Sequence, residues 1–448
     1  MIDFSTASLE TLIAKGGHDC ACGRHHSMVM DFLRIEPGAV KYIPEGLKAI
    51  GGTKPFIVCD KNTKEAAWDA VKAELDKAGI PYVLYCFPGK HIEPDEHAMG
   101  CLTMAYDPSC DCVMGIGSGV INDCCKVLCH AVGVKQMIVG TAPSMDGYAS
   151  NSSAMIRDRI KVSLYGDAPA AIICDIDIIK NAPMRMLWAG FGDMLAKYIA
   201  ICEWRIANLV TGEYYCENIA NLMRASLKKI VDNASGLKTR DEAAVQATVE
   251  GLVLSGVAMS YAGISRPASG LEHYFSHLWE MMALDRGTDY ELHGIQVGVG
   301  TLITLKLYDQ LRNLKPSRET AETFINEFTD EAWQEMIRGI FGQAAETVIE
   351  QEHTIFHKNC KVKHAARLTK ILEGWDDILR FMDEELPETE KIAALMADLE
   401  MPMVPADINV SREDTEKAFI GSRDIRDKYL SSTMLWDLGV LYTTKLPE

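Results

Sequence analysis

Short apolar runs alternate with amphipathic stretches through the first third of the chain. The apolar runs, which predict strands, lie at 55–60, 82–87, 112–117 and 136–140. The stretches 64–78 and 120–132 space their apolar residues three and four apart, as helices do. Strands that alternate with helices predict a parallel sheet with helices on both of its faces.

Beyond about residue 175 the pattern changes to long segments rich in Ala, Leu, Met, Glu and Lys. These segments, in which apolar residues recur at helical spacing, are 186–208, 213–233, 240–262, 270–284, 291–311, 319–341, 363–385 and 388–399. The sequence therefore predicts a Rossmann-like α/β domain over 1–175 and an all-helical domain over 176–448. We expect the linker within 166–183, where prolines, Asp and Asn cluster. From about Pro402 the pattern is too weak to predict elements.

Length and charge narrow the class of protein. A chain of 448 residues favours two domains. With 63 acidic and 45 basic residues its net charge is −18, which argues against nucleic acid or an anionic membrane as a partner. The uncharged run 251–265 is too short to span a bilayer. The 14 cysteines have no disulfide-scaffold spacing and no export signal precedes them, so we expect reduced thiols in a cytoplasmic protein.

A glycine-rich turn follows the strand predicted at 112–117. Gly115, Gly117 and Gly119 lie between this strand and the next helix. Such a turn lets a pyrophosphate approach the backbone N–H groups at the helix start. Glycines also serve simply to make tight turns, and Ile121 or Asn122 stands where the dinucleotide fingerprint has its third glycine.

A second polar loop, 140–150, follows the next strand and gathers hydroxyl side chains around Asp146. These residue types also favour simple side-chain-stabilised turns. Ligands in open α/β sheets nevertheless bind at the carboxyl ends of the strands, where both loops are expected.

Candidate metal ligands stand in the helical half. His273 and His277 are four residues apart, which places both imidazoles on one face of a helix, and His293 precedes another apolar helix. Asp193 follows the segment Gly190-Phe-Gly. One carboxylate and two or three imidazoles suit Zn²⁺, Fe²⁺ or Ni²⁺. Alternatively, Asp193 is a first-turn acid of a helix and the histidines are satisfied core groups.

The order of these motifs resembles the sn-glycerol-1-phosphate dehydrogenases, within the superfamily of iron-containing alcohol dehydrogenases and dehydroquinate synthases. The motifs are Gly-Ser-Gly with a following Asp, Thr-Ala-Pro-Ser-x-Asp-Gly, Gly-Asp, Ser-Gly-x-Glu-His-x-Phe-Ser-His and His-Gly-x-Gln-Val-Gly-x-Gly-Thr. The resemblance runs from about Cys20 to Thr301 and is closer to the bacterial branch. It implies a nucleotide-binding α/β domain, a helical metal-binding domain and an active site in the cleft between them.

The resemblance also implies roles for individual residues. The cofactor would be bound by Asp60, Gly119, Val120, Ile121, Asn122, Asp123, Thr141, Ala142, Pro143, Ser144 and Ser150. Of these, Asp60 would contact the adenosine ribose, and its charge favours NAD over NADP, although NADP is also a candidate.

The predicted metal ligands are Asp193, His273 and His293, holding one divalent ion: Ni²⁺, Zn²⁺ or Fe²⁺. Asp146 and His277 are the predicted catalytic residues, and these two with Asp193 would contact the substrate. Where some members of the superfamily have another histidine ligand, this chain has Lys197. Arg266 is a candidate for binding the substrate phosphate, with a solvated loop arginine as the alternative.

The implied reaction is the NAD(P)H-dependent reduction of dihydroxyacetone phosphate to sn-glycerol 1-phosphate, for phospholipid biosynthesis, in a cytoplasmic homo-oligomer such as a homodimer. A metal-dependent glycerol, polyol or alcohol dehydrogenase with an unphosphorylated substrate is one alternative. A lyase like dehydroquinate synthase is another. A binding protein without activity would leave both the glycine turn and the histidine pair unexplained.

The densest group of metal-ligand side chains lies elsewhere, in His18-Asp-Cys-Ala-Cys-Gly-Arg-His-His26. Cys20 and Cys22 lack the two-residue gap of a zinc knuckle, and no second Cys/His pair follows at the usual spacing. The resemblance places a Cys-Gly-x-x-His segment here, ahead of the first strand. We therefore expect reduced core thiols and a polar turn rather than a metal site.

Overall fold

The computed structural model describes residues 2–89, 92–158 and 160–447. The chain divides into two compact units, of which the first comprises Met1–Met194 and Cys216–Pro267. The second comprises Leu195–Tyr215 and Ala268–Glu448. The predicted domain boundary at residue 175 coincides with the end of the last strand, and as a domain boundary it stays a prediction.

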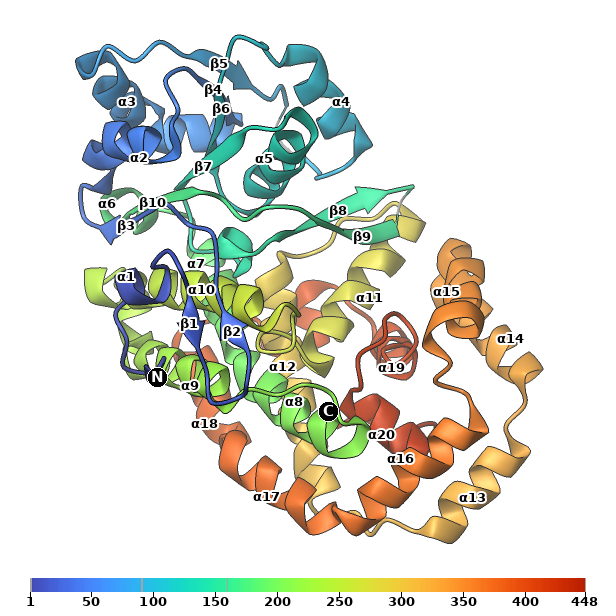
Figure 1. Cartoon of the computed structure of the whole chain (residues 1–448). Coiled ribbons are helices and arrows are strands. Elements are labelled where there is room, and N and C mark those ends of the chain that lie inside the picture. Colours follow the sequence, from blue (N-terminus) through green and yellow to red (C-terminus); the bar gives the residue numbers. More distant parts are fainter. Residues whose placement is uncertain (1, 90–91, 159, 448) are drawn as a thin grey trace. The chain divides into compact units, whose positions relative to one another are not determined.

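A six-stranded sheet with every neighbouring pair parallel forms the centre of the first unit (Figure 1). In spatial order its strands are β3 (Phe32–Glu36), β10 (Ala171–Asp175), β7 (Lys135–Gly140), β6 (Cys112–Gly117), β4 (Pro55–Cys59) and β5 (Val83–Cys86). The four strands predicted from apolar runs are β4, β5, β6 and β7. Together with the helix-rich remainder, the sheet confirms the predicted fold class.

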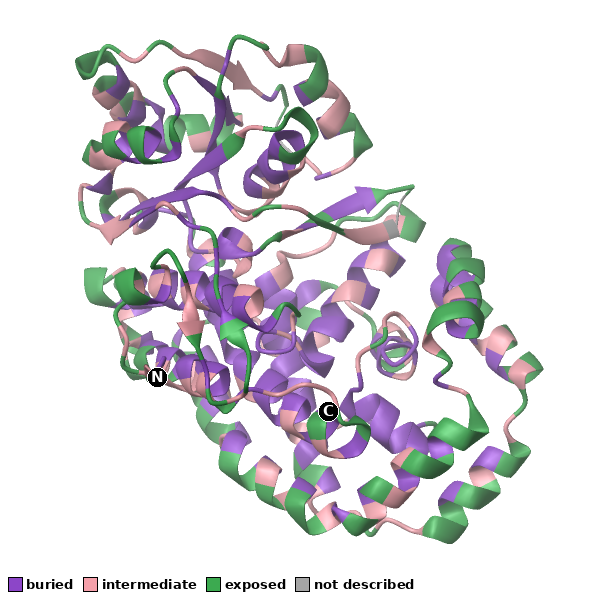
Figure 2. Ribbon diagram, viewed as in Figure 1, coloured by how far each residue is buried: buried purple, intermediate pink, exposed green. Residues whose placement is uncertain are grey.

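Helices cover both faces of the sheet because the strands are apolar on both sides. Ile57 and Cys59 of β4 belong to the buried cluster that contains α2 (Ile43–Ile50) and α3 (Lys61–Lys77). The intervening Phe56 and Val58 pack with α4 (Glu96–Ala105) and α5 (Gly119–Val132). Figure 2 shows the buried central strands between these partly exposed helices. This alternation is typical of a parallel sheet with two covered faces.

Several strands lie where the apolar runs predicted none. β10 occupies the segment expected as a linker, which is wrong for these residues because the strand pairs with both β3 and β7. Its apolar run Ala-Ile-Ile-Cys-Asp is short and is flanked by prolines and acidic residues, which is why no strand was predicted there. β8 (Ser152–Arg157) and β9 (Ile160–Tyr165) form a separate antiparallel hairpin.

The remainder of the first unit is mostly helical. α9 (Glu217–Asp232), η3 (Ala234–Leu237) and α10 (Glu242–Ala262) pack together, and α10 also contacts η2 (Gly147–Ala149) and β3. The small elements are α1 (Leu9–Leu12), β1 (His18–Asp19), β2 (His25–His26), η1 (Ala39–Tyr42) and α6 (Ile176–Ile179). The first segment ends within the last turn of α7 (Met184–Leu195). By length and composition α10 alone among the described helices could cross a membrane, but 67% of its apolar window is buried, as in a core helix.

The second unit is all helical over its described residues. Its helices are α8 (Lys197–Thr211), α11 (Leu271–Arg286), α12 (His293–Leu311), α13 (Arg318–Glu327), α14 (Asp330–Phe341), α15 (Ala345–Gln351), α16 (Lys361–Glu373), α17 (Trp375–Glu385) and α18 (Thr389–Asp398), with short turns η4 (Gly342–Ala344) and η5 (Glu352–Phe356). Three predicted helices are each divided: the segment 186–208 forms α7 and α8, 319–341 forms α13 and α14, and 363–385 forms α16 and α17. Thr329 caps α14 by accepting a hydrogen bond from the Ala332 N–H, and Gly374 separates α16 from α17.

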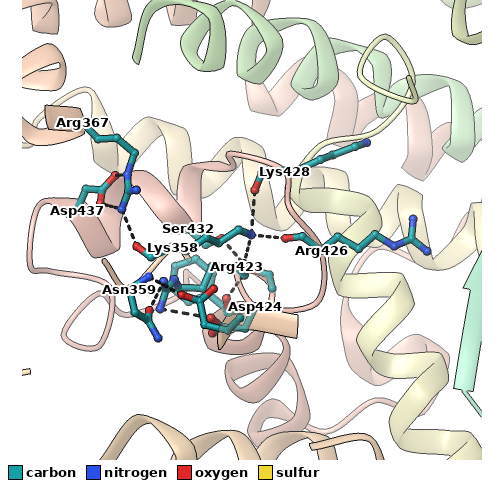
Figure 3. A network of polar contacts seen from close by, with 12 residues as sticks. Lys358, Asn359, Arg367, Arg423, Asp424, Arg426, Lys428, Ser432 and Asp437 are labelled. Carbon is teal, nitrogen blue, oxygen red and sulfur yellow. Dashed lines mark hydrogen bonds and ion pairs between the residues drawn. The ribbon is translucent and has the colours of Figure 1, made fainter. Parts of the chain in front are cut away.

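The last stretch, for which no element was predicted, folds as η6 (Pro405–Ile408), α19 (Arg412–Gly421) and α20 (Ser431–Asp437). Figure 3 shows what holds it in the second unit: the buried Lys358 ammonium donates to the backbone carbonyls of Arg423, Arg426 and Lys428. Arg367 also donates to both carboxylate oxygens of Asp437, at 2.7 and 2.8 Å. This stretch is therefore an integral part of the helical core.

Candidate active site

The glycine turn between β6 and α5 combines close packing with an open helix start. A Cβ at Gly117 would lie 2.6 Å from Cβ of Ile121, so packing alone requires this glycine. A Cβ at Gly119, the first residue of α5, would meet only Met145, at 3.3 Å. The N-cap residue Ser118 makes no side-chain hydrogen bond to the first turn. The start of α5 therefore offers backbone N–H groups and the positive end of the helix dipole to an anion.

Most side chains in the first turn of α5 are engaged within the fold. Ile121 is buried, and Asn122 accepts a 3.0 Å hydrogen bond from Nε2 of Gln136. Asp123 pairs with Lys126 at 2.8 Å and accepts from the Ala154 N–H. A diphosphate at this turn would therefore be bound by backbone N–H groups of residues such as Gly119 and Val120, not by these side chains.

The second predicted loop lies directly beside the glycine turn. The Thr141 N–H donates to the Gly117 carbonyl at 3.1 Å, because β6 and β7 are neighbours and end at the same edge of the sheet. Lys126 of α5 donates to the carbonyl of Gly147 at 3.2 Å, and the Ser150 hydroxyl donates to the same carbonyl at 3.1 Å. The two loops thus form one continuous polar edge at the carboxyl ends of the strands, as expected.

The other predicted residues of this loop differ in accessibility. Ala142 is buried, and its carbonyl accepts a 2.6 Å hydrogen bond from the Tyr148 hydroxyl. Pro143 is buried, and Ser144 is half-buried. Ser144 is therefore the hydroxyl side chain of this loop best placed to reach a ligand.

Asp60 is the N-cap residue of α3, at the carboxyl end of β4 and beside the glycine-bearing strand β6. Its Oδ1 accepts a 2.8 Å hydrogen bond from the Thr63 N–H, and Thr63 Oγ1 accepts from the Asp60 N–H at 3.0 Å. This reciprocal pair is a capping box, so Asp60 has a structural role in addition to any contact with ribose.

Asp146 and Asp193, far apart in sequence, are joined directly in the first unit. Oδ2 of the buried Asp193 accepts a 3.0 Å hydrogen bond from the Asp146 N–H, and the Ser255 hydroxyl donates to Asp146 at 2.8 Å. α7 presses against this loop, because a Cβ at Gly190 would lie 1.9 Å from the Pro143 carbonyl oxygen. Asp193 lies in the last turn of α7, so the alternative that it is a first-turn acid is wrong.

The three histidines converge in the second unit. His273 and His277 project from α11, and His293 is the first residue of α12. The ring centroid of His293 is 5.4 Å from that of His273 and 5.4 Å from that of His277. A Cβ at Gly300 would lie 2.6 Å from the Glu272 carbonyl oxygen, so this glycine permits the close packing of α11 on α12.

Hydrogen bonds fix which ring nitrogens remain for a metal. Nδ1 of His273 contacts Glu272 Oε1 at 2.8 Å, and Nδ1 of His293 contacts the Ser276 hydroxyl at 2.8 Å and Glu280 Oε1 at 3.2 Å. A carboxylate only accepts, so it keeps the proton on Nδ1 and leaves the lone pair on Nε2, as is usual for metal-bound histidines. The donors present therefore fit a divalent ion.

Glu280 is a residue that the sequence interpretation missed. One ligand atom each from His277, Glu280 and His293 lie within 4.8 Å of one another, so Glu280 could itself bind an ion or orient His293. Its signal was its position on α11, seven residues after His273 and three after His277, which is the same helix face.

The predicted metal ligands belong to different compact units. Asp193 lies in the first unit, whereas His273 and His293 lie in the second, so their convergence on one ion stays a prediction. Arg266, in the first unit, is only 1% exposed and is not a solvated loop arginine. Lys197, in the second, is also buried.

A buried carboxylate positions the histidine-bearing helix. Oε2 of Glu203, on α8, accepts a 3.0 Å hydrogen bond from the Leu271 N–H at the start of α11. Oε1 accepts from the Tyr308 hydroxyl at 3.2 Å and from the N–H and hydroxyl of Ser431. Glu203 therefore joins four helices of the second unit and fixes the start of α11.

Comparison with known proteins identifies the family. The chain is 33% identical over 314 residues to "Glycerol-1-phosphate dehydrogenase [NAD(P)+]" of Halalkalibacterium halodurans, an alignment that covers 69% of this chain and 77% of the relative. The chain belongs to the glycerol-1-phosphate dehydrogenase family. It is thus an oxidoreductase, as the motif order predicted.

Two further comparisons extend the glycerol-1-phosphate dehydrogenase assignment. The relative of the same name from Bacillus licheniformis is 28% identical over 426 residues, covering 94% of this chain and 93% of the relative, so the likeness continues beyond the segment recognised from motifs. Residues 34–183, which contain most of the parallel sheet, match the family model described as iron-containing alcohol dehydrogenase. Maleylacetate reductase from Rhizobium sp. strain MTP-10005 shares the fold, with a TM-score of 0.57, 12% identity, and coverage of 94% and 99%.

Proposed function

We propose that the protein reduces dihydroxyacetone phosphate to sn-glycerol 1-phosphate, using NADH or NADPH and one divalent metal ion. The observation that carries the proposal is the set of oriented imidazoles at His273 and His293, in a chain of the glycerol-1-phosphate dehydrogenase family. The metal would be Ni²⁺, Zn²⁺ or Fe²⁺, since all three accept imidazole and carboxylate ligands.

The first unit would bind the dinucleotide along the edge formed by the glycine turn and residues 141–150. The open start of α5 suits the diphosphate, and the half-buried Ser144 suits the nicotinamide side. The negative charge of Asp60 would repel a 2′-phosphate, which favours NADH over NADPH.

Asp193, His273 and His293 would hold the metal. When bound, the ion supplies Lewis acidity at the substrate carbonyl oxygen, and the reduced nicotinamide supplies hydride to C2. Asp146, held by Ser255, would orient a substrate hydroxyl. His277, half-buried beside His293, would donate the proton that the C2 oxygen gains.

Arg266 is the proposed partner of the substrate phosphate. A buried guanidinium forms strong bidentate hydrogen bonds with phosphate, and in a chain of net charge −18 a local cation is needed to attract an anionic substrate. We further propose that the enzyme acts in the cytoplasm as a homo-oligomer. The fourteen free cysteines support a reducing compartment.

An NADH-oxidation assay with dihydroxyacetone phosphate, dihydroxyacetone and glyceraldehyde 3-phosphate, with and without added metal, tests the proposal. We expect turnover with dihydroxyacetone phosphate only, and at least about a tenfold rise in its KM in Arg266→Ala, since one buried charged contact is worth about 1.5–3 kcal/mol. Equal turnover of dihydroxyacetone in the parent and in Arg266→Ala would instead indicate a polyol dehydrogenase.

A further inference from the structure

The hairpin at the N-terminal end of the first unit gathers thiols and an imidazole from two distant parts of the chain. β1 and β2 pair antiparallel, and the turn between them holds Cys20 and Cys22. His26 ends β2, and Cys216 is the N-cap residue of α9, 190 residues further on. One ligand atom from each of these four residues lies within 4.8 Å of the other three.

Three of the six separations between ligand atoms are close to the edges of a zinc tetrahedron. Zn–S bonds of about 2.3 Å and Zn–N bonds of about 2.0–2.1 Å require S···S edges of about 3.8 Å and S···N edges of about 3.6 Å. The Cys20 and Cys216 sulfurs are 3.6 Å apart, and the Cys216 sulfur is 3.6 Å from Nε2 of His26. The Cys22 sulfur is 3.3 Å from the same Nε2.

The imidazole of His26 is held in the orientation that a metal ligand needs. Its Nδ1 lies 2.9 Å from the Tyr261 carbonyl oxygen, which can only accept, so Nδ1 carries the proton and Nε2 presents its lone pair to the three sulfurs. The ring stacks on Tyr261 at a centroid distance of 5.6 Å and is only 1% exposed.

The fold closes the cluster and places polar groups around its sulfurs. Cys216 stands at the start of a 16-residue helix, whose positive dipole end stabilises negative charge. The Asn218 amide donates to the Cys20 sulfur at 3.8 Å. Cys20, His26 and Cys216 are buried and only Cys22 is half-buried. A closed set of three thiolates and one imidazole fills four tetrahedral positions, which is typical of a structural zinc site rather than a catalytic one.

We propose that Cys20, Cys22, His26 and Cys216 bind a structural Zn²⁺ that ties the N-terminal hairpin to α9. This site shares no ligand with the proposed catalytic metal site, whose predicted ligands contain no sulfur. The zinc proposal therefore does not depend on the catalytic metal. The sequence alone did not indicate this zinc site, because the fourth ligand is far along the chain from the His18–His26 segment.

Zinc content of the enzyme purified under reducing conditions tests the proposal. We expect the parent to hold one equivalent of zinc more than Cys216→Ser and than Cys22→Ser, whose half-buried position makes misfolding a smaller concern. Cys360→Ser, which changes an exposed thiol of the second unit, serves as the matched control and should retain the parent's zinc. Equal zinc in the parent and in Cys22→Ser overturns the proposal.

Cobalt substitution separates this site from the catalytic one. Co²⁺ bound by three thiolates gives intense sulfur-to-metal charge-transfer absorption, which imidazole and carboxylate ligands do not give. We expect this absorption in the Co²⁺-loaded parent and in His273→Ala, and its loss or marked weakening in Cys22→Ser. Its absence from the parent, or a Cys20–Cys216 disulfide in place of the metal, overturns the proposal.

Discussion

A histidine binds a metal through one ring nitrogen, and the partner of its other nitrogen decides which one. In the second unit Glu272 engages Nδ1 of His273, while Ser276 and Glu280 engage Nδ1 of His293. Each imidazole is thereby fixed before any ion arrives. Such preorganisation reduces the entropy lost on binding and makes the neighbouring carboxylates part of the metal site.

Replacement of His273 by alanine is expected to remove the catalytic metal and to lower kcat at least about 100-fold, because loss of a ligand costs more than loss of an orienting neighbour. Metal analysis and NADH oxidation measure the two effects. His353→Ala, which changes an exposed histidine of the same unit, should keep both. Unchanged metal content and turnover in His273→Ala would refute the proposed ligand set.

Asp60→Asn is expected to change cofactor preference without loss of the helix cap. Asparagine caps a helix about as well as aspartate, so α3 should remain intact. Removal of the negative charge should lower the KM for NADPH relative to that for NADH by about tenfold, equivalent to about 1.4 kcal/mol. Steady-state kinetics with both cofactors test this, and an unchanged ratio would show that Asp60 is only a cap.

Local patterns in the sequence identified residues of the candidate site that follow strands or share one helix. The glycine turn, the 140–150 loop and the His273/His277 pair are of this kind. Glu203 and Cys216 were not predicted, because their partners come from segments remote in sequence. The periodicity of one sequence does not indicate which remote segments are in contact.

Among the structural elements, α7 is in unusually close contact with the loop after β7. Gly190→Ala would place a Cβ 1.9 Å from the Pro143 carbonyl oxygen, so α7 or the loop must move. We expect a loss of about 1–3 kcal/mol in the free energy of unfolding, as for other overpacked sites, together with reduced activity. Denaturant titration measures the loss.

Gly339→Ala is the matched control for this change. Gly339 lies within α14, and its added Cβ would meet nothing within 4 Å. Because alanine favours helix, this variant should gain up to about 1 kcal/mol of stability. Similar stability changes in both variants would contradict the close approach at Gly190.

The elements predicted best were those with an uninterrupted pattern. β4 and β6 are continuous apolar runs, and α5 keeps its helical spacing throughout. Breaks of one or two residues, such as Gly374 between α16 and α17, were missed because the apolar spacing continues across them. β10 was missed because turn-forming residues flank so short a strand.

At the scale of the whole molecule, buried thiols make the free energy of unfolding depend on pH in the alkaline range. Burial raises the pKa of Cys59 and of Cys174 to about 12, and raises that of Cys125 well above its ordinary value. Unfolded thiols ionise near pH 9, so between about 9 and 12 the folded state binds more protons than the unfolded state. The free energy of unfolding therefore falls as pH rises through this window.

We expect each such thiol to lower stability by up to about 1.4 kcal/mol per pH unit above about pH 9. Lys358 opposes the trend: burial lowers its pKa to about 8, so its contribution rises between about 8 and 10.5, but it is a single group. Denaturant unfolding in reducing buffer at about pH 7.5 and 10.5 measures the net fall. Cys174→Ala should lose about 2 kcal/mol less across this interval than the parent, and an equal loss would contradict the assignment.

The first compact unit is not continuous in sequence, which constrains how the protein is made. Residues 195–215 belong to the second unit, and the chain then returns to the first to add α9 and α10. The ribosome therefore synthesises the whole parallel sheet before Cys216 and Ser255, the partners of the hairpin and of Asp146. Domains tend to fold as they emerge, but the 140–150 loop gains its Ser255 contact only after about eighty residues beyond the last strand have been added. At about 5–20 residues per second, this interval lasts several seconds.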